Sequence, residues 1–384
     1  MMEKNDCALK IENISVGSEN NPIFIIAEIG QNHQGSIEVA KKLILSAKEC
    51  GCNCVKFQKS HLTTKFTGKA LLRPYNGENS WGKTYGEHKM FLEFSLEQYG
   101  ELRNFANQLG LIFSASAMDE ISLSQLVDLQ LSFIKIGSGD ANNFKLLQDA
   151  AKTHIPLIIS TGMQNMITIE KIVEIMNDNC KKNFALLHCV SSYPTNLEDS
   201  TLKMIKLFKK KFPNVVIGYS GHEKGILLSQ IAVLLGAKIV ERHFTLNKNQ
   251  KGSDHSVSLD PTEMRLLVER IRNFEKQGYT KIMRTDEQII KILKCENENS
   301  VRQSLKDVSS KEILPCELPC RKKLGKSLVY RKPLKENYII KTEDIIAKVS
   351  EPFGISAEFI YEVIGRKLKV NVAEDEIIEF IHLY

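Results

Sequence analysis

A repeated alternation between residues 23 and 245 constrains the fold of this chain more than any other feature. Short runs rich in β-branched and aromatic residues alternate there with segments of helical periodicity, a pattern typical of a parallel sheet covered by helices. The runs occupy residues 23–29, 52–58, 111–116, 133–136, 156–160, 184–190, 215–220 and 238–245. This number of strands favours a closed (β/α)8 TIM barrel, with a doubly wound open sheet as the alternative.

The segments between these runs predict the helices of the barrel. They occupy residues 37–49, 97–109, 121–129, 143–152, 168–177, 199–210, 225–235 and 261–276. Two of them have a clear N-cap: Ser36 precedes the first, and Asp260 precedes Pro261 at the start of the last. The connection 59–96 is too long to be a plain link, and long loops on a barrel usually belong to the active site.

Polar residues gather where the expected strands end. They are Glu28, Lys56, Gln58, Ser116, Lys135, Ser138, Ser160, Ser191, Tyr193, Ser220, His222 and His243. The carboxyl ends of barrel strands meet at one mouth, so we expect these side chains to share one site. An open sheet would scatter several of them.

Two lysines in this set predict an anion site. Lys135 stands in a short apolar run, where its ammonium must be paired or hydrated, and the glycines of the following turn 137–140 let backbone N–H groups converge on the same anion. Together with Lys56 and the serine hydroxyls, it predicts a site for a phosphorylated carboxylate. His222 and His243 end consecutive strands and could bind one divalent metal together.

The composition fits one large and one smaller domain. The chain has 384 residues, of which 42% are hydrophobic and 26% charged, enough apolar residues for a sizeable core. We predict a barrel over residues 1–277, a Lys/Glu/Asn-rich linker over 278–313 and a small domain with β content over 314–384.

Charge and hydropathy narrow the expected partners and location. The net charge of +6 is spread along the chain, which favours small anionic substrates over nucleic acid. The sequence has no run of about 18 apolar residues and no apolar segment typical of a signal peptide. We therefore expect no membrane partner and a cytoplasmic location.

Several long motifs resemble the sialic acid synthase family across nearly the whole chain. They are residues 27–35 (AEIGQNHQG), 56–58 (KFQ), 135–140 (KIGSGD), 218–222 (GYSGH) and 241–243 (ERH). Residues 81–88 (WGKTYGEH), 251–256 (KGSDHS) and 324–327 (LGKS) are similar to the animal members of that family. The resemblance implies a TIM barrel followed by an antifreeze-like (SAF, β-clip) domain. It also implies a domain-swapped homodimer, in which each small domain caps the partner's barrel, and a divalent metal, Mn²⁺ or Mg²⁺.

The resemblance also implies roles for the strand-end residues. Those that would hold phosphoenolpyruvate are Lys56, Ser116, Lys135, Ser138, Ser160, Ser191 and Ser220. His222 and His243 would hold the metal. The residues that would contact the sugar are Glu28, Gln58, Tyr193 and Asp254, and Asp140 stands where bacterial members carry Glu. Glu28 is also the candidate for moving a proton.

The function implied is condensation of phosphoenolpyruvate with N-acetylmannosamine 6-phosphate, giving N-acetylneuraminate 9-phosphate and phosphate. For the sugar phosphate we expect Arg73, Lys83 and Lys251 to supply positive charge at one rim of the mouth. One alternative is a sister synthase that uses free N-acetylmannosamine or mannose 6-phosphate. Another, from a different class, is a non-catalytic protein that binds sugar phosphates.

Overall fold

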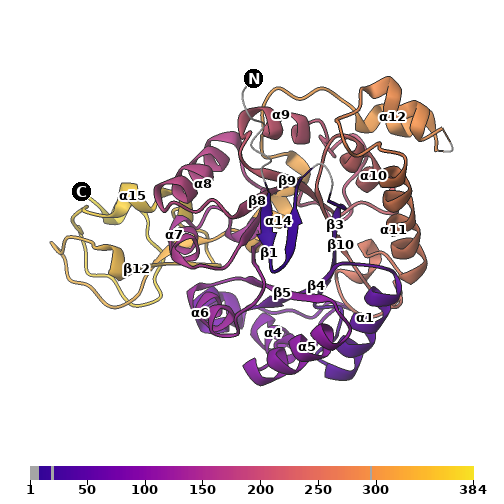
Figure 1. The fold of residues 1–384 in the computed structure, drawn as a ribbon. Coiled ribbons are helices and arrows are strands. Elements are labelled where there is room, and N and C mark those ends of the chain that lie inside the picture. Colours follow the sequence, from indigo (N-terminus) through magenta and orange to yellow (C-terminus); the bar gives the residue numbers. More distant parts are fainter. Residues whose placement is uncertain (1–7, 19–20, 295) are drawn as a thin grey trace.

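The predicted barrel is confirmed in the computed structural model, which describes residues 8–18, 21–294 and 296–384 (Figure 1). The parallel strands close into a ring in the order β10-β3-β4-β5-β6-β7-β8-β9. Their bounds are β3 (Phe24–Gly30), β4 (Cys54–Lys59), β5 (Ile112–Ala117), β6 (Ile134–Ile136), β7 (Leu157–Ser160), β8 (Phe184–Cys189), β9 (Val216–Gly221) and β10 (Ile239–His243). Each coincides with a predicted run to within about two residues, so the open sheet is excluded.

A ring of helices surrounds the strands. Its members are α1 (Ile37–Glu49), α5 (Leu96–Gln108), α6 (Glu120–Asp128), α7 (Phe144–Lys152), α8 (Met166–Asp178), α9 (Met204–Lys211), α10 (Leu227–Leu234) and α11 (Pro261–Lys276). The two predicted caps form: Ser36 accepts from the N–H of Val39, and Asp260 makes a reciprocal capping box with Glu263. These caps fix where the first and last helices of the ring begin.

The side chains that point into the barrel are apolar at one end and polar at the other. Successive side chains of a strand face opposite sides, so every second residue points into the barrel. The inward residues near the amino ends form one apolar cluster: Phe24, Ile26, Cys54, Ile112, Phe133, Ile158, Ala185, Leu187, Val216 and Ile239. Two residues after the apolar Phe133, just before β6, the next inward side chain is Lys135. On β4, the next inward side chain after Cys54 is likewise a lysine, Lys56. Charged inward side chains therefore lie toward the carboxyl ends.

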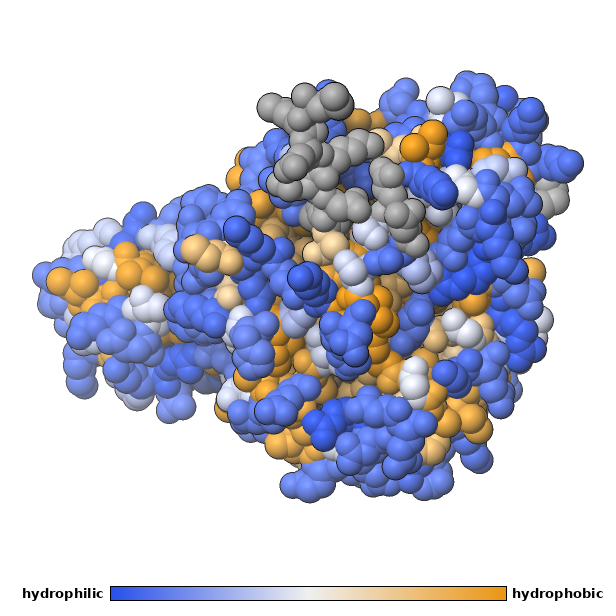
Figure 2. All heavy atoms as spheres, in the orientation of Figure 1, coloured by the Kyte–Doolittle hydropathy of each residue, from blue (hydrophilic) through white to orange (hydrophobic). Residues whose placement is uncertain are grey.

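A short hairpin that the sequence pattern did not predict closes the amino end. Its antiparallel strands are β1 (Leu9–Ile11) and β2 (Ile14–Val16). Leu9, Ile11 and Val16 are almost fully buried and belong to the apolar cluster inside the barrel. Figure 1 looks onto this end, with β1 over the centre of the ring, and Figure 2 shows hydrophobic surface around the hairpin. The hairpin thus completes the core at this end.

The long loop after β4 folds into short helices. They are α2 (Leu62–Lys65), α3 (Gly68–Leu72) and α4 (Tyr85–Leu92). Phe66, Ala70 and Tyr85 form a small separate core with Val349 from the far end of the chain. This loop is therefore an ordered wall beside the mouth.

The chain beyond the barrel crosses the mouth before it forms the small domain. Its elements are α12 (Asp286–Ile292), α13 (Glu298–Ser304), η3 (Pro315–Glu317), α14 (Leu318–Leu324), β11 (Ser327–Tyr330), β12 (Ile345–Lys348) and α15 (Ile360–Val363). The small domain projects to one side of the ring in Figure 1. Backbone bonds join it to the loop wall, from Val349 to Lys65 (2.8 Å) and from Thr67 to Val349 (3.0 Å). Within the described ranges, no helix combines the length and apolar character needed to cross a membrane.

Candidate active site

A cavity of about 480 Å³ opens at the carboxyl ends of the strands. Its volume falls within the range of small-molecule sites. The structure brings together in its lining these residues selected from the sequence: Glu28, Lys56, Gln58, Ser116, Lys135, Ser138, Asp140, Ser160, Ser191, Tyr193, Ser220, His222, His243 and Asp254. They come from all parts of the barrel sequence, so closure of the barrel is what assembles the site.

Two buried lysines form the floor of the cavity. Lys56 and Lys135 are each only 2% exposed. Lys56 pairs with Glu28 and lies 3.9 Å from Glu241, and Lys135 lies 3.7 Å from the same Glu241. Lys56 also donates to Ser116 on β5 at 3.0 Å, and Lys135 donates to Ser160 on β7 at 2.7 Å. The two carboxylates keep this pair of cations close together in a site nearly closed to water.

Burial and charge act in opposite directions on these groups. Burial disfavours the charge on Lys56, but Glu241 and Glu28 outweigh it and raise its pKa. For Lys135 burial prevails, helped by Lys56, and its pKa is lowered. Burial also disfavours the charge on Glu241, but the two lysines, with His243, hold its pKa below the ordinary value. The floor is thus a coupled ionic group that can accept a small anion.

A compact cradle of hydroxyls adjoins the lysines. Ser138 Oγ accepts from the N–H of Gly162 at 3.0 Å. A Cβ atom at position 162 would lie 2.3 Å from Ser191 Oγ and 2.8 Å from Ser138 Oγ, so only glycine lets the two serines approach this loop. Gln164 fixes the cradle from outside by donating to the carbonyl of Ser138 at 2.9 Å.

The two histidines face each other, with ring centroids 5.6 Å apart. Nδ1 of His222 donates to the carbonyl of Val190 at 2.9 Å, which leaves Nε2 as a free lone pair. Nδ1 of His243 has no hydrogen-bond partner among the described residues. Burial lowers the pKa of both rings, so both are neutral at neutral pH. Two neutral, unengaged imidazole nitrogens fit a divalent metal.

The histidines would supply only part of a coordination shell. Across the described ranges, no group of three or more His, Cys, Asp or Glu side chains could hold a metal ion. A metal on His222 and His243 would therefore keep open positions for water or substrate oxygens. Open positions distinguish catalytic from structural metal sites.

A buried ion pair holds the strand ends that carry the histidines. Arg242, next to His243, donates to Glu223 at 2.7 Å, and Glu223 directly follows His222. Tyr219 and Ser229 donate to the same carboxylate at 2.9 and 2.8 Å. This network lies outside the cavity lining, and its hydrogen bonds fix the relative orientation of β9 and β10.

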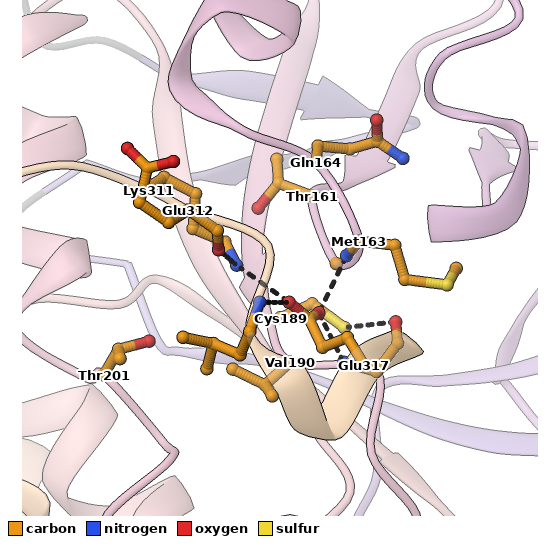
Figure 3. A network of polar contacts seen from close by, with 12 residues as sticks. Thr161, Met163, Gln164, Cys189, Val190, Thr201, Lys311, Glu312 and Glu317 are labelled. Atoms are coloured by element: carbon orange, nitrogen blue, oxygen red, sulfur yellow. Dashed lines mark hydrogen bonds and ion pairs between the residues drawn. The ribbon is translucent and has the colours of Figure 1, made fainter. Parts of the chain in front are cut away.

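Glu317 ties the chain after the barrel to the mouth (Figure 3). Its carboxylate is fully buried and accepts from the backbone N–H of Met163 (2.7 Å), Ser191 (2.9 Å) and Leu314 (3.0 Å). Lys311 Nζ lies 3.7 Å away. Because Met163 and Ser191 follow β7 and β8, one side chain fixes two strand-end loops. It also sets η3 and α14 over the cavity, whose lining they complete with Cys316, Pro319, Cys320, Lys323 and Leu324.

Three residues expected at the rim are not among those that line the cavity. Arg73 pairs with Glu351 of the small domain at 3.0 Å. Lys251 lies over the ring of Trp81, 5.2 Å from its centroid, and Lys83 is exposed on the loop. The folding of the long loop, which the sequence pattern does not specify, directs these cations to the small domain or to the surface.

Asp140 lines the cavity but already has a partner. Its carboxylate lies 2.6 Å from Nζ of Lys326, at the start of the small domain. Lys326 also donates to the carbonyl of Met118 at 2.6 Å. Asp140 therefore joins the turn after β6 to the small domain.

Sequence reasoning missed four charged residues that line the cavity: Glu241, Lys65, Lys89 and Lys323. Strand alternation could have found Glu241, because it lies two residues before His243 on β10 and so faces the same way. No comparable periodicity marks the three lysines, which lie on α2, α4 and α14.

Comparison with known proteins adds to this geometry. Residues 43–282 match the NeuB family, and residues 325–383 match the SAF domain. The chain is 52% identical over 366 residues to N-acetylneuraminate-9-phosphate synthase of Drosophila melanogaster, covering 95% of this chain and 97% of that protein. Identity to the Homo sapiens protein of the same name is 46% over 363 residues, covering 94% and 93%. The crystal structure of spore coat polysaccharide biosynthesis protein SpsE from Bacillus subtilis superimposes with a TM-score of 0.78 at 27% identity, covering 98% and 99%.

Proposed function

Since this chain belongs to the NeuB family, we propose that it condenses phosphoenolpyruvate with N-acetylmannosamine 6-phosphate to give N-acetylneuraminate 9-phosphate and phosphate. The two relatives named N-acetylneuraminate-9-phosphate synthase, 52% and 46% identical to nearly the whole chain, support this choice of substrates. The alternative of a non-catalytic sugar-phosphate-binding protein finds no support among these relatives, which are named as synthases.

One observation carries the proposal. A buried pair of lysines and a pair of neutral histidines line the same cavity, with a hydroxyl cradle between strand ends. The first pair suits a phosphorylated carboxylate, and the second suits a metal that activates a carbonyl. A condensing enzyme needs both functions side by side.

Lys56 and Lys135 would bind phosphoenolpyruvate from the floor. Each can make charge-assisted hydrogen bonds to the phosphate or carboxylate, and the cradle of Ser138 and Ser191 can donate to the remaining oxygens. Lys56 and Lys135 lie on β4 and β6, and Ser138 and Ser191 follow β6 and β8, so the barrel holds all four in place and they need little reorganisation on binding.

His222 and His243 would hold the divalent metal, Mn²⁺ or Mg²⁺. Bound there, the metal would supply Lewis acidity to a carbonyl oxygen. The chain's own part is to keep both imidazoles neutral by burial and to orient His222 through Val190. The ring of Tyr193 packs against His222, tilted by 40° with centroids 4.1 Å apart, and so restricts the imidazole further.

The reaction forms one carbon–carbon bond and releases phosphate. C3 of phosphoenolpyruvate attacks the aldehyde carbon of the open-chain sugar, and the aldehyde oxygen becomes a hydroxyl by gaining a proton. Water adds at C2 and loses a proton, and the tetrahedral intermediate collapses to the ketone as phosphate leaves. Glu28 accepts a hydrogen bond from Gln58 at 2.8 Å and lines the cavity, which suits it to moving one of these protons.

The domain-swapped homodimer and the cytoplasmic location stay predictions of the sequence. Among the described residues of the single chain, none after Leu324 lines the active-site cavity. A cross-linking measurement on the full chain, read together with its mass in solution, tests the dimer.

The test of the function is phosphate release from phosphoenolpyruvate with N-acetylmannosamine 6-phosphate, free N-acetylmannosamine or mannose 6-phosphate, with the nine-carbon product identified by mass spectrometry. We expect the first acceptor to give the highest kcat/KM. A higher kcat/KM with mannose 6-phosphate or the free sugar would identify a sister synthase. Release of no phosphate with any acceptor would contradict an enzymatic role.

A further inference from the structure

We propose that Lys65, Lys89 and Lys323 form the subsite that holds the phosphate of the sugar acceptor. This inference rests on the proposed function and names the residues that select a phosphorylated sugar over a free one. All three lysines line the active-site cavity, and they come from α2, α4 and α14, segments far apart in the sequence. We name them the lysine triad.

The three lysines, of which Lys65 is buried and Lys89 and Lys323 are half-buried, lack acidic partners. Within the described residues, no carboxylate lies within ion-pair distance of any of the three. Lys65 is only 7% exposed, and its ammonium donates to the thioether sulfur of Met118 at 2.7 Å. Lys89 donates to the amide oxygen of Gln31 at 2.8 Å. A buried cation with only a weak, neutral acceptor is costly, and an anion in the cavity would remove that cost.

The three charges also act on one another. Lys89 lies within electrostatic reach of both Lys65 and Lys323. Burial, then the neighbouring lysine, lowers the pKa of Lys65 and of Lys89 to about 8. The carboxylates that face them, Asp140 and Asp254, offset this only in part. A sugar phosphate carries roughly two negative charges at pH 7 and would relieve the repulsion.

The position of the triad fits the far end of the acceptor. Asp254 lies 3.9 Å from Nδ1 of His243, and its carboxylate also feels Lys89 and Lys323. It therefore lies between the histidines, where the aldehyde would react, and the triad. An open-chain sugar 6-phosphate has its aldehyde at one end and its phosphate at the other, so this order of groups matches it, with its hydroxyls near Asp254.

The triad is separate from the lysine pair on the floor. Lys56 and Lys135 have Glu28 and Glu241 as acidic neighbours and belong to strands. The triad belongs to the walls above them. Two cationic groups in one cavity match two phosphorylated substrates, one for each group.

The test uses Lys89→Ala, Lys323→Ala and Lys65→Met, the last chosen to keep the apolar stem packed. Matched controls are Lys69→Ala and Lys322→Ala, which remove exposed lysines from α3 and α14. For each full-length variant, kcat/KM is measured with N-acetylmannosamine 6-phosphate and with free N-acetylmannosamine, and KM is measured for phosphoenolpyruvate. Circular dichroism melting checks that each variant is folded.

We expect each triad variant to lose about tenfold or more in kcat/KM for the phosphorylated sugar, the loss that follows from one charge-assisted contact. Changes with the free sugar and in KM for phosphoenolpyruvate should stay within about twofold, as should every value for the controls. Equal losses with both sugars would overturn the subsite. A raised KM for phosphoenolpyruvate would instead assign the lysines to that substrate's phosphate.

A binding measurement separates failure of this subsite from failure of the proposed function. Calorimetry with N-acetylmannosamine 6-phosphate and with the free sugar needs no turnover. If the wild-type chain forms no product, the function fails. The subsite is supported if the wild-type chain binds the phosphorylated sugar more tightly than the free sugar and Lys89→Ala abolishes that preference. It is contradicted if the wild-type chain shows no preference, or if Lys89→Ala retains it.

Discussion

The two ends of the barrel are built on the same strands and differ in almost every other respect. At the amino end, inward residues such as Phe24 and Ile239 pack under the β1–β2 hairpin without a charged group in their cluster. At the mouth, two or four residues further along the same strands, Glu28, Glu241 and His243 face a cavity. One end contributes apolar burial and the other concentrates ionic groups, so we expect substitutions at the two ends to affect different properties.

The largest effect should come from His243→Ala at the mouth. If His243 holds a metal, its loss removes Lewis-acid activation worth several kcal/mol, and kcat/KM should fall about a thousandfold or more. The free energy of unfolding should change by under about 1 kcal/mol, because the ring borders a cavity and its Nδ1 has no partner among the described residues. Steady-state kinetics and urea unfolding check the two parts.

Binding of Mn²⁺ to this variant gives a second readout that does not depend on turnover. Titration followed by electron paramagnetic resonance should show binding to the wild-type chain and at least tenfold weaker binding to His243→Ala and to His222→Ala. Equal affinity in all three proteins would contradict the histidine site.

At the closed end, Ile11→Ala should have the opposite profile. Ile11 is fully buried in the apolar cluster, so its truncation should lower the free energy of unfolding by about 2 to 5 kcal/mol. At temperatures where the variant is folded, kcat/KM should remain within about twofold of the wild-type value. Lys10→Ala, an exposed neighbour on β1, is the control and should change neither quantity. A large loss of kcat/KM in a folded Ile11 variant would show that the two ends are coupled.

Strand β6 allows the same comparison across its two faces. Lys135→Ala should raise KM for phosphoenolpyruvate about tenfold or more, from loss of a charge-assisted contact of about 1.5 to 3 kcal/mol. Ile136→Val, next to it but facing the helices, should cost about 0.5 to 1.5 kcal/mol of stability and leave KM unchanged. An unchanged KM in Lys135→Ala would remove Lys135 from the phosphoenolpyruvate site.

The smallest predicted effect is a pH dependence of acceptor choice. Lys65 and Lys89 have a folded-state pKa lowered to about 8, below the ordinary 10.5, so they lose their protons as pH rises through 8. The ratio of kcat/KM for phosphorylated over free N-acetylmannosamine should therefore fall severalfold between pH 7 and pH 9. The other charged or titratable groups that act on one or both lysines are Tyr85, Asp140, Lys326, Lys323, Asp254, Glu93 and Arg73.

The sign of the stability effect follows from the same shift. Between about pH 8 and pH 10.5 the unfolded chain binds more protons at these lysines than the folded chain does, so their contribution to stability rises with pH in that window. Below about pH 8 both lysines are charged, and their unfavourable contribution to the free energy of unfolding is at its full size. Lys65→Met should therefore stabilise the protein at pH 7 and reduce this rise, and a destabilised Lys65→Met with unchanged pH dependence would contradict the lowered pKa.

Sequence reasoning predicted the barrel well because the barrel repeats one local pattern. Each strand and helix is marked by its own periodicity and caps, and closure follows from their number. The hairpin was missed because β1 and β2 have only three residues each, too short for a periodic signal. The site residues at the strand ends were predicted for the same reason, because locating a strand also locates its carboxyl end.

The walls of the site were harder to predict. The sequence alone does not distinguish the lysines that line the cavity from the cations first expected there. Outside the strands, no periodicity shows which side chain turns inward. The two sets are Lys65, Lys89 and Lys323, and Arg73, Lys83 and Lys251. Tertiary contacts decide it: Glu351 engages Arg73, whereas the pairing of Val349 with the backbone of Lys65 holds α2 against the cavity. Contacts between segments so distant in the sequence have no local signature.

Glu317 comes after every strand of the barrel in chain order, yet it accepts the N–H groups of Met163 and Ser191. During synthesis from the amino end, the ring of strands can therefore close while these two loops still lack their acceptor. Lys323, six residues later, has not yet reached the cavity at that stage. A ribosome-bound chain that ends before Glu317 would contain every strand of the barrel but lack part of the site. The barrel can therefore fold before the chain is able to bind its substrates.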